Sequence, residues 1–220
     1  MRVVFRADAG TDMGIGHVMR CLTLADGLTA RRHVCHFVCR ERTGHLARQI
    51  EARGYPVTLL AKRRDSSDWL GTSEEQDAND TRKALGYAPI DWFVTDHYGI
   101  GEAWEAAFRK SGARMLSIDD LADRVHDCDL LLDQTLGRVA ADYAGLIPSG
   151  AGLLLGASMA LLRPRFAQLR QQSLERRARG VGRMLVSLGG ADASNLTTRV
   201  IDAIDRCSWS EPVAVDVVLG

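Results

Sequence analysis

Short runs of β-branched and apolar residues alternate along the chain with longer segments whose apolar residues recur every three or four positions. The short runs are typical of buried strands, and the longer segments of amphipathic helices. Their regular alternation predicts βαβ units and a parallel sheet, and so an α/β fold. Strands are expected at residues 2–6, 34–39, 57–60, 92–95, 114–118, 130–132 and 153–155, and helices at 17–30, 45–53, 74–85 and 102–110.

These elements predict two domains joined by a linker. Residues 1–162 hold enough strands and helices for one Rossmann-like, doubly wound domain. Residues 163–182 are rich in Arg and Gln and predict a solvated inter-domain helix and a linker; a basic nucleic-acid-binding arm is the alternative. Residues 183–220 then offer only two strands (183–188 and 213–219) and one helix, which cannot bury both faces of a sheet. We therefore expect an incomplete second Rossmann-like, nucleotide-binding domain there.

Composition excludes several classes of protein. The 220 residues carry 28 Lys and Arg against 28 Asp and Glu, and this balance gives no sign of a nucleic-acid or membrane partner. Residues 1–8 lack the pattern of a signal peptide, so a cytoplasmic protein is expected. The uncharged stretch 143–162 contains Pro148 and four glycines, which predict a loop, a short buried strand and a turn instead of a membrane span. Cys35 and Cys39 share one expected strand and are interpreted as free core thiols.

The candidate chemistry lies directly after the first strand. A turn containing Gly10, Gly14 and Gly16 leads into a helix and places His17 in its first turn, at the carboxyl end of a strand. The free N–H groups and the positive dipole end there favour an anion and a neutral imidazole that can accept a proton. A dinucleotide fingerprint is the weaker alternative, because its third glycine is missing. An equally open alternative is that His17 has only a structural role as a cap of the helix.

Five separated blocks of sequence resemble one enzyme family. RADAG..MGIGHVMRCLTLA near the start is followed by TDHYGIGEAWE (95–105), SIDDLADRVHDCDLLLDQT (117–135), LLLGASMALLRPRF (153–166) and LVSLGGADASNLT (185–197). In this order and spacing they closely resemble the PseG family. Its members are UDP-2,4-diacetamido-2,4,6-trideoxy-beta-L-altropyranose hydrolases of pseudaminic acid biosynthesis, with the two-domain glycosyltransferase-B fold shared with MurG.

The resemblance implies roles for individual residues. His17 matches the histidine thought to activate the water that displaces UDP at the anomeric carbon, a step in which an oriented water and a base suffice without a metal or cofactor. Arg20 lies one turn further on the same face, where it could hold the pyrophosphate or the sugar or remain a surface residue. Tyr98 is a candidate to contact the sugar, with core packing as its alternative. The remaining candidates for substrate binding are the glycines before the helix and the turn of the second domain: Gly14, Gly16, Gly189, Gly190 and Asn195.

The sequence also departs from the family pattern. Ala157, Ser158 and Met159 stand where the family usually has an aromatic residue, and the family continues beyond VDVVLG with loops that bind most of the uridine and diphosphate. We therefore expect a C-terminally truncated member that is poorly active alone. The expected function is inverting, metal-independent hydrolysis of a UDP-linked diacetamido-trideoxy sugar. A MurG-like UDP-sugar glycosyltransferase and an inactive fragment are the alternatives, and the sugar stereoisomer and the oligomeric state stay open.

Overall fold

A computed structural model describes residues 1–63, 69–86, 88–178, 180–188, 192 and 194–219. The chain divides into two compact units, Met1–Leu161 and Leu162–Gly220. The first unit contains, in chain order, β1 (Arg2–Ala7), α1 (Gly16–Thr29), β2 (Val34–Arg40), α2 (Ala47–Ala52), β3 (Val57–Leu60), α3 (Glu74–Leu85), β4 (Trp92–Asp96), α4 (Glu102–Arg109), β5 (Arg114–Ile118), β6 (Leu130–Asp133), the 3-10 turn η1 (Ala140–Tyr143), β7 (Gly152–Leu155) and the 3-10 turn η2 (Ala157–Met159).

The first unit is built on a seven-stranded sheet in the order β3-β2-β1-β4-β5-β6-β7. Every neighbouring pair in it runs parallel. The predicted α/β fold class is confirmed, and each predicted strand agrees with the observed one to within a residue at either end. The predicted helix at 45–53 is shorter in the structure, because the Nδ1 atom of His45 accepts a hydrogen bond from the Ala47 N–H and places the helix start after it.

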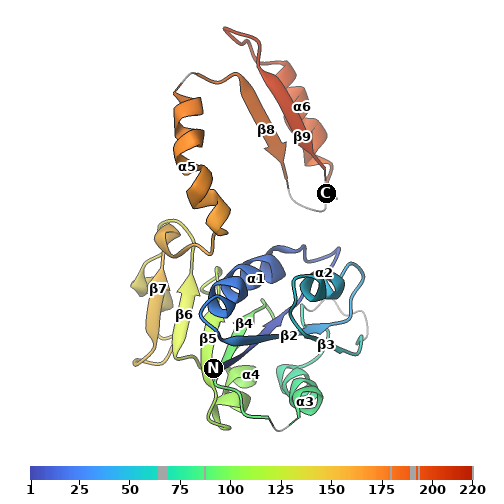
Figure 1. The fold of residues 1–220 in the computed structure, drawn as a ribbon, viewed down its shortest axis with the longest axis vertical. Coiled ribbons are helices and arrows are strands. Elements are labelled where there is room, and N and C mark those ends of the chain that lie inside the picture. The colour runs from blue at the N-terminus through green and yellow to red at the C-terminus, as the bar shows by residue number, and fades with distance from the viewer. Residues whose placement is uncertain (64–68, 87, 179, 189–191, 193, 220) are drawn as a thin grey trace. The chain divides into compact units, whose positions relative to one another are not determined.

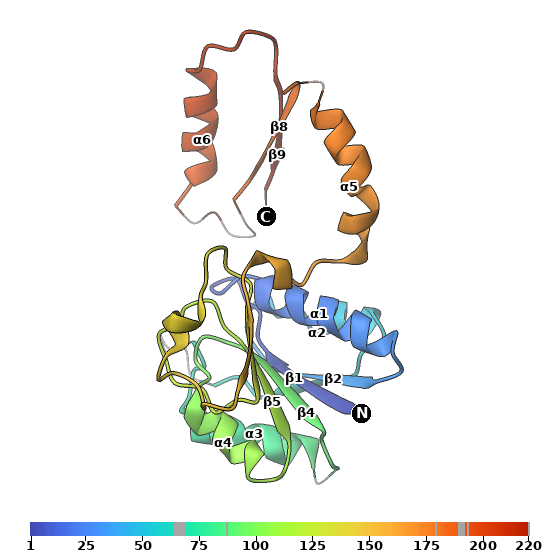
Figure 2. The same cartoon turned by 90° about the vertical axis from the view of Figure 1, so that its left-hand side faces the viewer.

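Helices cover both faces of this sheet. α1 and α2 lie on one face, and α3 and α4 lie on the other (Figures 1 and 2). The face under α1 packs Phe5 and Phe37 against Val18 and Leu22, and the opposite face packs Phe93 against Trp104. Strands sandwiched in this way have apolar side chains on both faces, which explains the nearly continuous apolar runs in the sequence.

The direction in which successive strands are added reverses between β1 and β4. β2 and β3 extend the sheet on one side of β1, whereas β4 to β7 extend it on the other. At such a point the loops after the two neighbouring strands diverge and leave a crevice at their carboxyl ends, where open α/β sheets bind ligands. In this chain those loops begin at Asp8 and His97.

Buried ion pairs hold α3 against the first two strands. Asp77 on α3 accepts hydrogen bonds from Arg6 on β1 (2.9 Å) and from Arg40 on β2 (2.6 Å). Arg6 also contacts Asp8 at 2.5 Å, and all four side chains are at least 98% buried. Such charges are costly to bury, but here every carboxylate faces a guanidinium. The network fixes the carboxyl end of β1, from which the Gly-rich turn departs.

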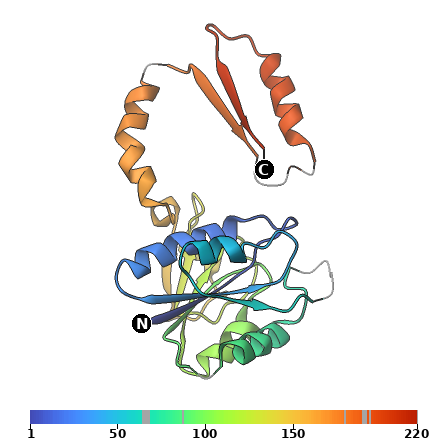
Figure 3. The ribbon, with the colours of Figure 1, turned by 45° about the vertical axis from the view of Figure 1, so that its right-hand side comes forward.

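The second unit contains α5 (Pro164–Arg177), β8 (Arg183–Ser187), α6 (Leu196–Asp205) and β9 (Ala214–Val218). β8 and β9 pair in parallel, and α5 and α6 lie on opposite sides of them (Figure 3). Val186 in β8 is buried, but several other apolar side chains of these strands remain exposed, as predicted for a two-stranded sheet: Leu185 is 67% exposed and Val218 53%.

The uncharged stretch 143–162 is not one continuous helix. It contains the end of η1, then β7, then η2, although β7 is half-buried and not fully buried as predicted. Within the described ranges, no helix has the length and apolarity to cross a lipid bilayer. Cys35 and Cys39 are free, buried thiols, as predicted.

Candidate functional site

The Gly-rich turn after β1 places the start of α1 at the carboxyl ends of the strands. Gly10 and Gly14 exchange two backbone hydrogen bonds (3.2 and 2.8 Å), and Gly14 adopts φ +77°, a conformation that glycine takes without strain. α1 then begins at Gly16 with neither a side-chain cap nor an acidic residue in its first turn. No carboxylate of α1 itself therefore lies beside its first N–H groups and its positive dipole end.

His17, in the first turn of α1, is paired with a carboxylate from the neighbouring strand. The Nδ1 atom of His17 lies 2.6 Å from Oδ1 of Asp96, the last residue of β4. Burial by itself would raise the pKa of Asp96, but hydrogen bonds from Arg20 and His17 outweigh it and lower the pKa. The ionised carboxylate can only accept, so a neutral His17 ring carries its proton on Nδ1 and its lone pair on Nε2. With this tautomer, Nε2 can accept a proton from a molecule bound beside it.

Arg20 lies on the same face of α1, one turn further, as its spacing predicts. Its Nε atom is 2.5 Å from Oδ2 of Asp96 and its Nη2 atom 2.7 Å from Oδ1. Its Nη1 atom donates to Asp120, after β5, at 3.0 Å. Arg20 thus joins the ends of β4 and β5 to α1, and no longer counts as a plain surface arginine.

Two aromatic rings flank the histidine. The Tyr98 ring packs edge-on against His17 with centroids 4.7 Å apart, and Trp69 packs edge-on against Tyr98 at 5.0 Å. Burial and a hydrogen bond to Asp120 raise the pKa of Tyr98 to about 12, so the hydroxyl stays protonated. Tyr98 is half-buried and Trp69 is 43% exposed, which leaves aromatic surface beside the imidazole. Such surface suits the apolar face of a sugar ring.

His97 connects two of the loops that form this site. Its Nδ1 atom accepts a hydrogen bond from the Gly99 N–H at 3.0 Å, so the ring proton is on Nε2, which lies 3.2 Å from Asp8. Burial lowers the pKa of His97, against the opposing effect of Asp8. The residue ties the loop after β4 to the loop after β1, and it keeps Asp96 and Tyr98 where His17 can reach them.

Other titratable groups in the first unit form structural pairs. Nδ1 of His126 lies 2.9 Å from the buried Glu105, which also accepts from Ser117 at 2.6 Å. Asp119 and Asp120 point to different partners: Asp119 accepts from Tyr143, whereas Asp120 accepts from Arg20. Within the described residues, no three His, Cys, Asp or Glu side chains gather into a metal-binding group.

The predicted site residues of the second unit are described only in part. Gly189 and Gly190 lie outside the described residues. Asn195 precedes α6 with φ +47°, and its side chain accepts a hydrogen bond from Thr198 at 2.7 Å. The first N–H groups of α6, those of Leu196 and Thr197, already donate to the carboxylate of Asp192, each at 2.7 Å. The start of α6 thus has its own anion, in contrast to α1.

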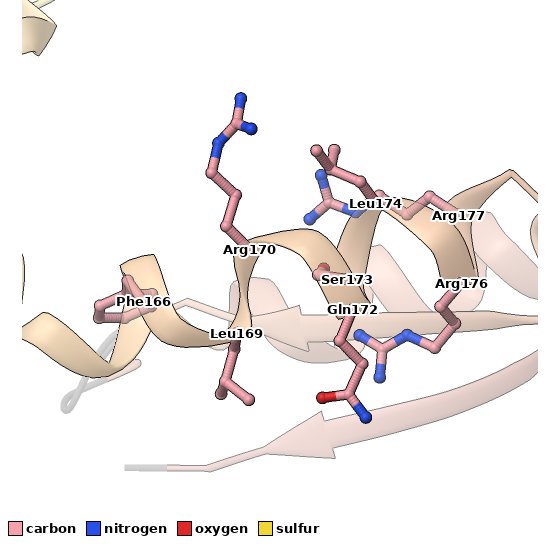
Figure 4. A pocket seen from close by; sticks show the side chains of 8 residues that line it. All are labelled: Phe166, Leu169, Arg170, Gln172, Ser173, Leu174, Arg176 and Arg177. Carbon is pink, nitrogen blue, oxygen red and sulfur yellow. The ribbon is translucent and has the colours of Figure 1, made fainter.

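A pocket in the second unit runs along α5, and all eight side chains that line it come from that helix (Figure 4). None of these residues was predicted from the sequence to belong to a site. The lining residues are Phe166, Leu169, Arg170, Gln172, Ser173, Leu174, Arg176 and Arg177.

Sequence reasoning did not assign the two carboxylates that complete the site. Asp96 ends β4 and Asp120 lies two residues after β5, so both reach the same sheet edge, but their pairing with α1 depends on β1 lying beside β4. The available signal was their position within two residues of the ends of predicted strands, which indicates a ligand-binding edge but not which side chains meet there.

Three comparisons with known proteins bear on this site. No family model matches the chain. It is 28% identical over 207 residues to the UDP-2,4-diacetamido-2,4,6-trideoxy-beta-L-altropyranose hydrolase of Campylobacter jejuni, covering 94% of this chain and 66% of that protein. An uncharacterized protein of Methanocaldococcus jannaschii is 23% identical over the whole chain, which spans 43% of it.

A solved structure shows the fold. MurG of Acinetobacter baumannii matches with a TM-score of 0.59 at 13% identity, over all of this chain and 67% of that one. The chain spans two thirds or less of the curated relatives it matches. It is a distant homologue of a UDP-sugar hydrolase over most of its length and has a MurG-like glycosyltransferase-B fold.

Proposed function

We propose that this chain carries the water-activating site of a UDP-sugar hydrolase. The observation that carries the proposal is the pairing of His17 with Asp96 at the uncapped start of α1, at the crevice between β1 and β4. A base with its lone pair on Nε2, beside a helix end that favours anions, is what displacement of a diphosphate by water requires.

The reaction follows from these positions. His17 Nε2 takes a proton from a water molecule as the water oxygen bonds to the anomeric carbon. The bond from that carbon to the diphosphate oxygen breaks, and its electron pair leaves with UDP. Attack opposite to the leaving group inverts the anomeric configuration. Asp96 stabilises the imidazolium that forms, as the buried acid of a catalytic triad does.

The remaining site residues have supporting roles in this proposal. The first N–H groups of α1, at Gly16 and after the Gly14 turn, favour the negative charge that develops on the diphosphate. The Tyr98 ring, whose centroid lies 4.7 Å from that of the His17 ring, is placed where it can contact the sugar. Gly189, Gly190 and Asn195 remain candidates on the nucleotide side. We assign no cofactor, because UDP departs readily once the water is oriented and deprotonated.

The substrate class rests on the homologue from Campylobacter jejuni, whose name states the sugar: a UDP-linked 2,4-diacetamido-2,4,6-trideoxy-altropyranose. We propose the same class for this protein, and pseudaminic acid biosynthesis as its setting. Epimers of this sugar differ in the placement of a few hydrogen-bonding groups, so a panel of UDP-diacetamido sugars decides the stereoisomer.

The test is turnover of that panel by the full-length protein in water enriched in ¹⁸O, without any acceptor. We expect equal amounts of UDP and free sugar, no ¹⁸O in the UDP phosphates, and an initial sugar anomer of inverted configuration by NMR. His17→Asn should lower kcat by about 10² to 10⁴ and leave UDP affinity nearly unchanged. His33→Asn is the matched control, because His33 precedes β2 and so lies at the amino ends of the strands, away from the carboxyl ends where His17 lies.

Two outcomes would contradict the proposal. If UDP is released only when an acceptor alcohol is present, the site orients an acceptor hydroxyl and the protein is a glycosyltransferase. If His17→Asn keeps the wild-type rate, the histidine has no part in the reaction.

A further inference from the structure

The guanidinium of Arg20 grips one carboxylate with two parallel contacts. Nε meets Oδ2 of Asp96 at 2.5 Å, and Nη2 meets Oδ1 at 2.7 Å. This fork-to-fork geometry fixes the plane of the carboxylate as well as its position, which a single contact does not.

The opposite edge of the same guanidinium is held as well. Nη1 donates to Asp120 at 3.0 Å, and Asp120 also accepts from the Tyr98 hydroxyl. The Arg20 side chain is only 12% exposed. Three of its five N–H groups are thus committed to carboxylates of its own chain, and the low exposure of the side chain limits access to the other two.

The carboxylate that Arg20 holds also contacts His17, through one shared oxygen atom. Oδ1 of Asp96 accepts from Arg20 at 2.7 Å and from the His17 Nδ1 at 2.6 Å. The carboxylate cannot rotate away from the fork without also losing the imidazole. The direction of the Nδ1–H bond, and with it the direction of Nε2, therefore depends on the guanidinium.

We propose that Arg20 is a positioning residue for His17, acting through Asp96, and not a ligand of the substrate diphosphate. The kinetic part of this proposal rests on the proposed hydrolase function, whereas its structural part does not. Charge alone is insufficient for the role, because an ammonium group at the same place cannot form the two parallel contacts.

The first experiment is kinetic and uses the full-length protein. Arg20→Lys keeps the charge but loses the fork, so we expect kcat to fall by about 10- to 100-fold while KM and the Kd for UDP change by less than about threefold. Arg109→Lys is the control: Arg109 also bridges two carboxylates, Asp127 and Asp129, but at the end of α4. A Kd for UDP raised about tenfold or more with kcat retained would make Arg20 a diphosphate ligand and overturn the proposal.

The second experiment needs no substrate, so it stands even if the hydrolase assignment fails. In ¹⁵N NMR of the 220-residue chain, the His17 ring should be a single Nδ1–H tautomer when neutral. Arg20→Gln removes the fork that holds the Asp96 carboxylate in place, so the His17 ring should show mixed tautomers. Asp96, Tyr98 and Cys21 also face this region and remain unchanged in the variant.

If both Arg20 variants fail to fold, Asp120→Asn replaces them. It leaves the fork intact and weakens the third contact, and the His17 signals should shift in the same direction by a smaller amount. Unchanged His17 signals in any folded variant would overturn the proposal.

Discussion

At the scale of single residues, the ionisation of Asp96 decides what His17 can do. The carboxylate has no proton to give, so the imidazole must donate through Nδ1. An amide in the same place offers both a donor and an acceptor, and the ring then has no fixed tautomer.

Asp96→Asn should therefore lower kcat by about 10² to 10⁴ while the Kd for UDP stays near wild type, because the ring can then take the tautomer that points a proton, and not a lone pair, toward the water. Steady-state kinetics and UDP titration of the full-length protein measure both. Asp123→Asn, an exposed carboxylate beside Arg124, is the control. Retained kcat in Asp96→Asn would remove the carboxylate from the mechanism.

The backbone at Gly14 is a second constraint at this scale. Its φ of +77° lies in the left-handed region, whereas Gly16, the first residue of α1, has an ordinary backbone and open space at its Cβ position. Gly14→Ala should cost about 1–2 kcal/mol of unfolding free energy, and Gly16→Ala should be neutral or slightly stabilising. Urea unfolding of both variants compares them directly, and equal stabilities would contradict the strain at Gly14.

At the scale of elements, the chain's own pattern predicts nearly all of the strands and helices but not their neighbours. A nearly continuous apolar run marks β1 and another marks β4, because each strand is buried on both faces. Such runs do not show which strands are neighbours in the sheet. The pairing of His17 with Asp96 spans 79 positions and follows from the strand order alone. The position of Arg20 on the same face of α1 as His17 was predictable, because residues three positions apart on a helix share a face.

The buried pairs between α3 and the strands also belong to this scale. Burial raises the pKa of Asp77, but the charges and hydrogen bonds of Arg6 and Arg40 outweigh it and lower the pKa to about 2. An unfolded Asp titrates near 3.9. The stabilisation is therefore present above about pH 4 and is lost as the pH falls toward 2.

Asp77→Asn should remove this stabilisation and leave two buried arginines short of a charge partner, at a cost of about 3–5 kcal/mol at pH 7. Its stability should also fall less steeply with acid than that of the wild type. Urea unfolding between pH 7 and pH 2.5 tests both expectations. A variant as stable as the wild type at pH 7, with the same acid slope, would refute the role of these pairs.

At the scale of the whole molecule, the two units differ in how much apolar surface they bury. The first has a core on each face of its sheet, whereas Leu185, Val218 and Leu219 in the second are more than half exposed. Compact units with their own cores unfold as units.

We therefore expect one cooperative unfolding transition from about the first 160 residues, and early proteolysis after about residue 170. Calorimetry measures the first property, and limited trypsin digestion with mass spectrometry measures the second. Early cleavage within the first 160 residues, or the absence of a cooperative transition, would contradict this expectation.

The position of β1 in the sheet has a consequence for the order in which the protein is made. β1 leaves the ribosome before β2 and β4, yet it ends up between them, and about fifty residues separate β2 from β4 along the chain. Until β4 has been synthesised, one edge of β1 has no partner strand, and His17 lacks its contact with Asp96. The first half of the first unit therefore depends on the second half to complete its sheet, and a nascent chain can form the His17–Asp96 pair only after β4 has been made and has paired with β1.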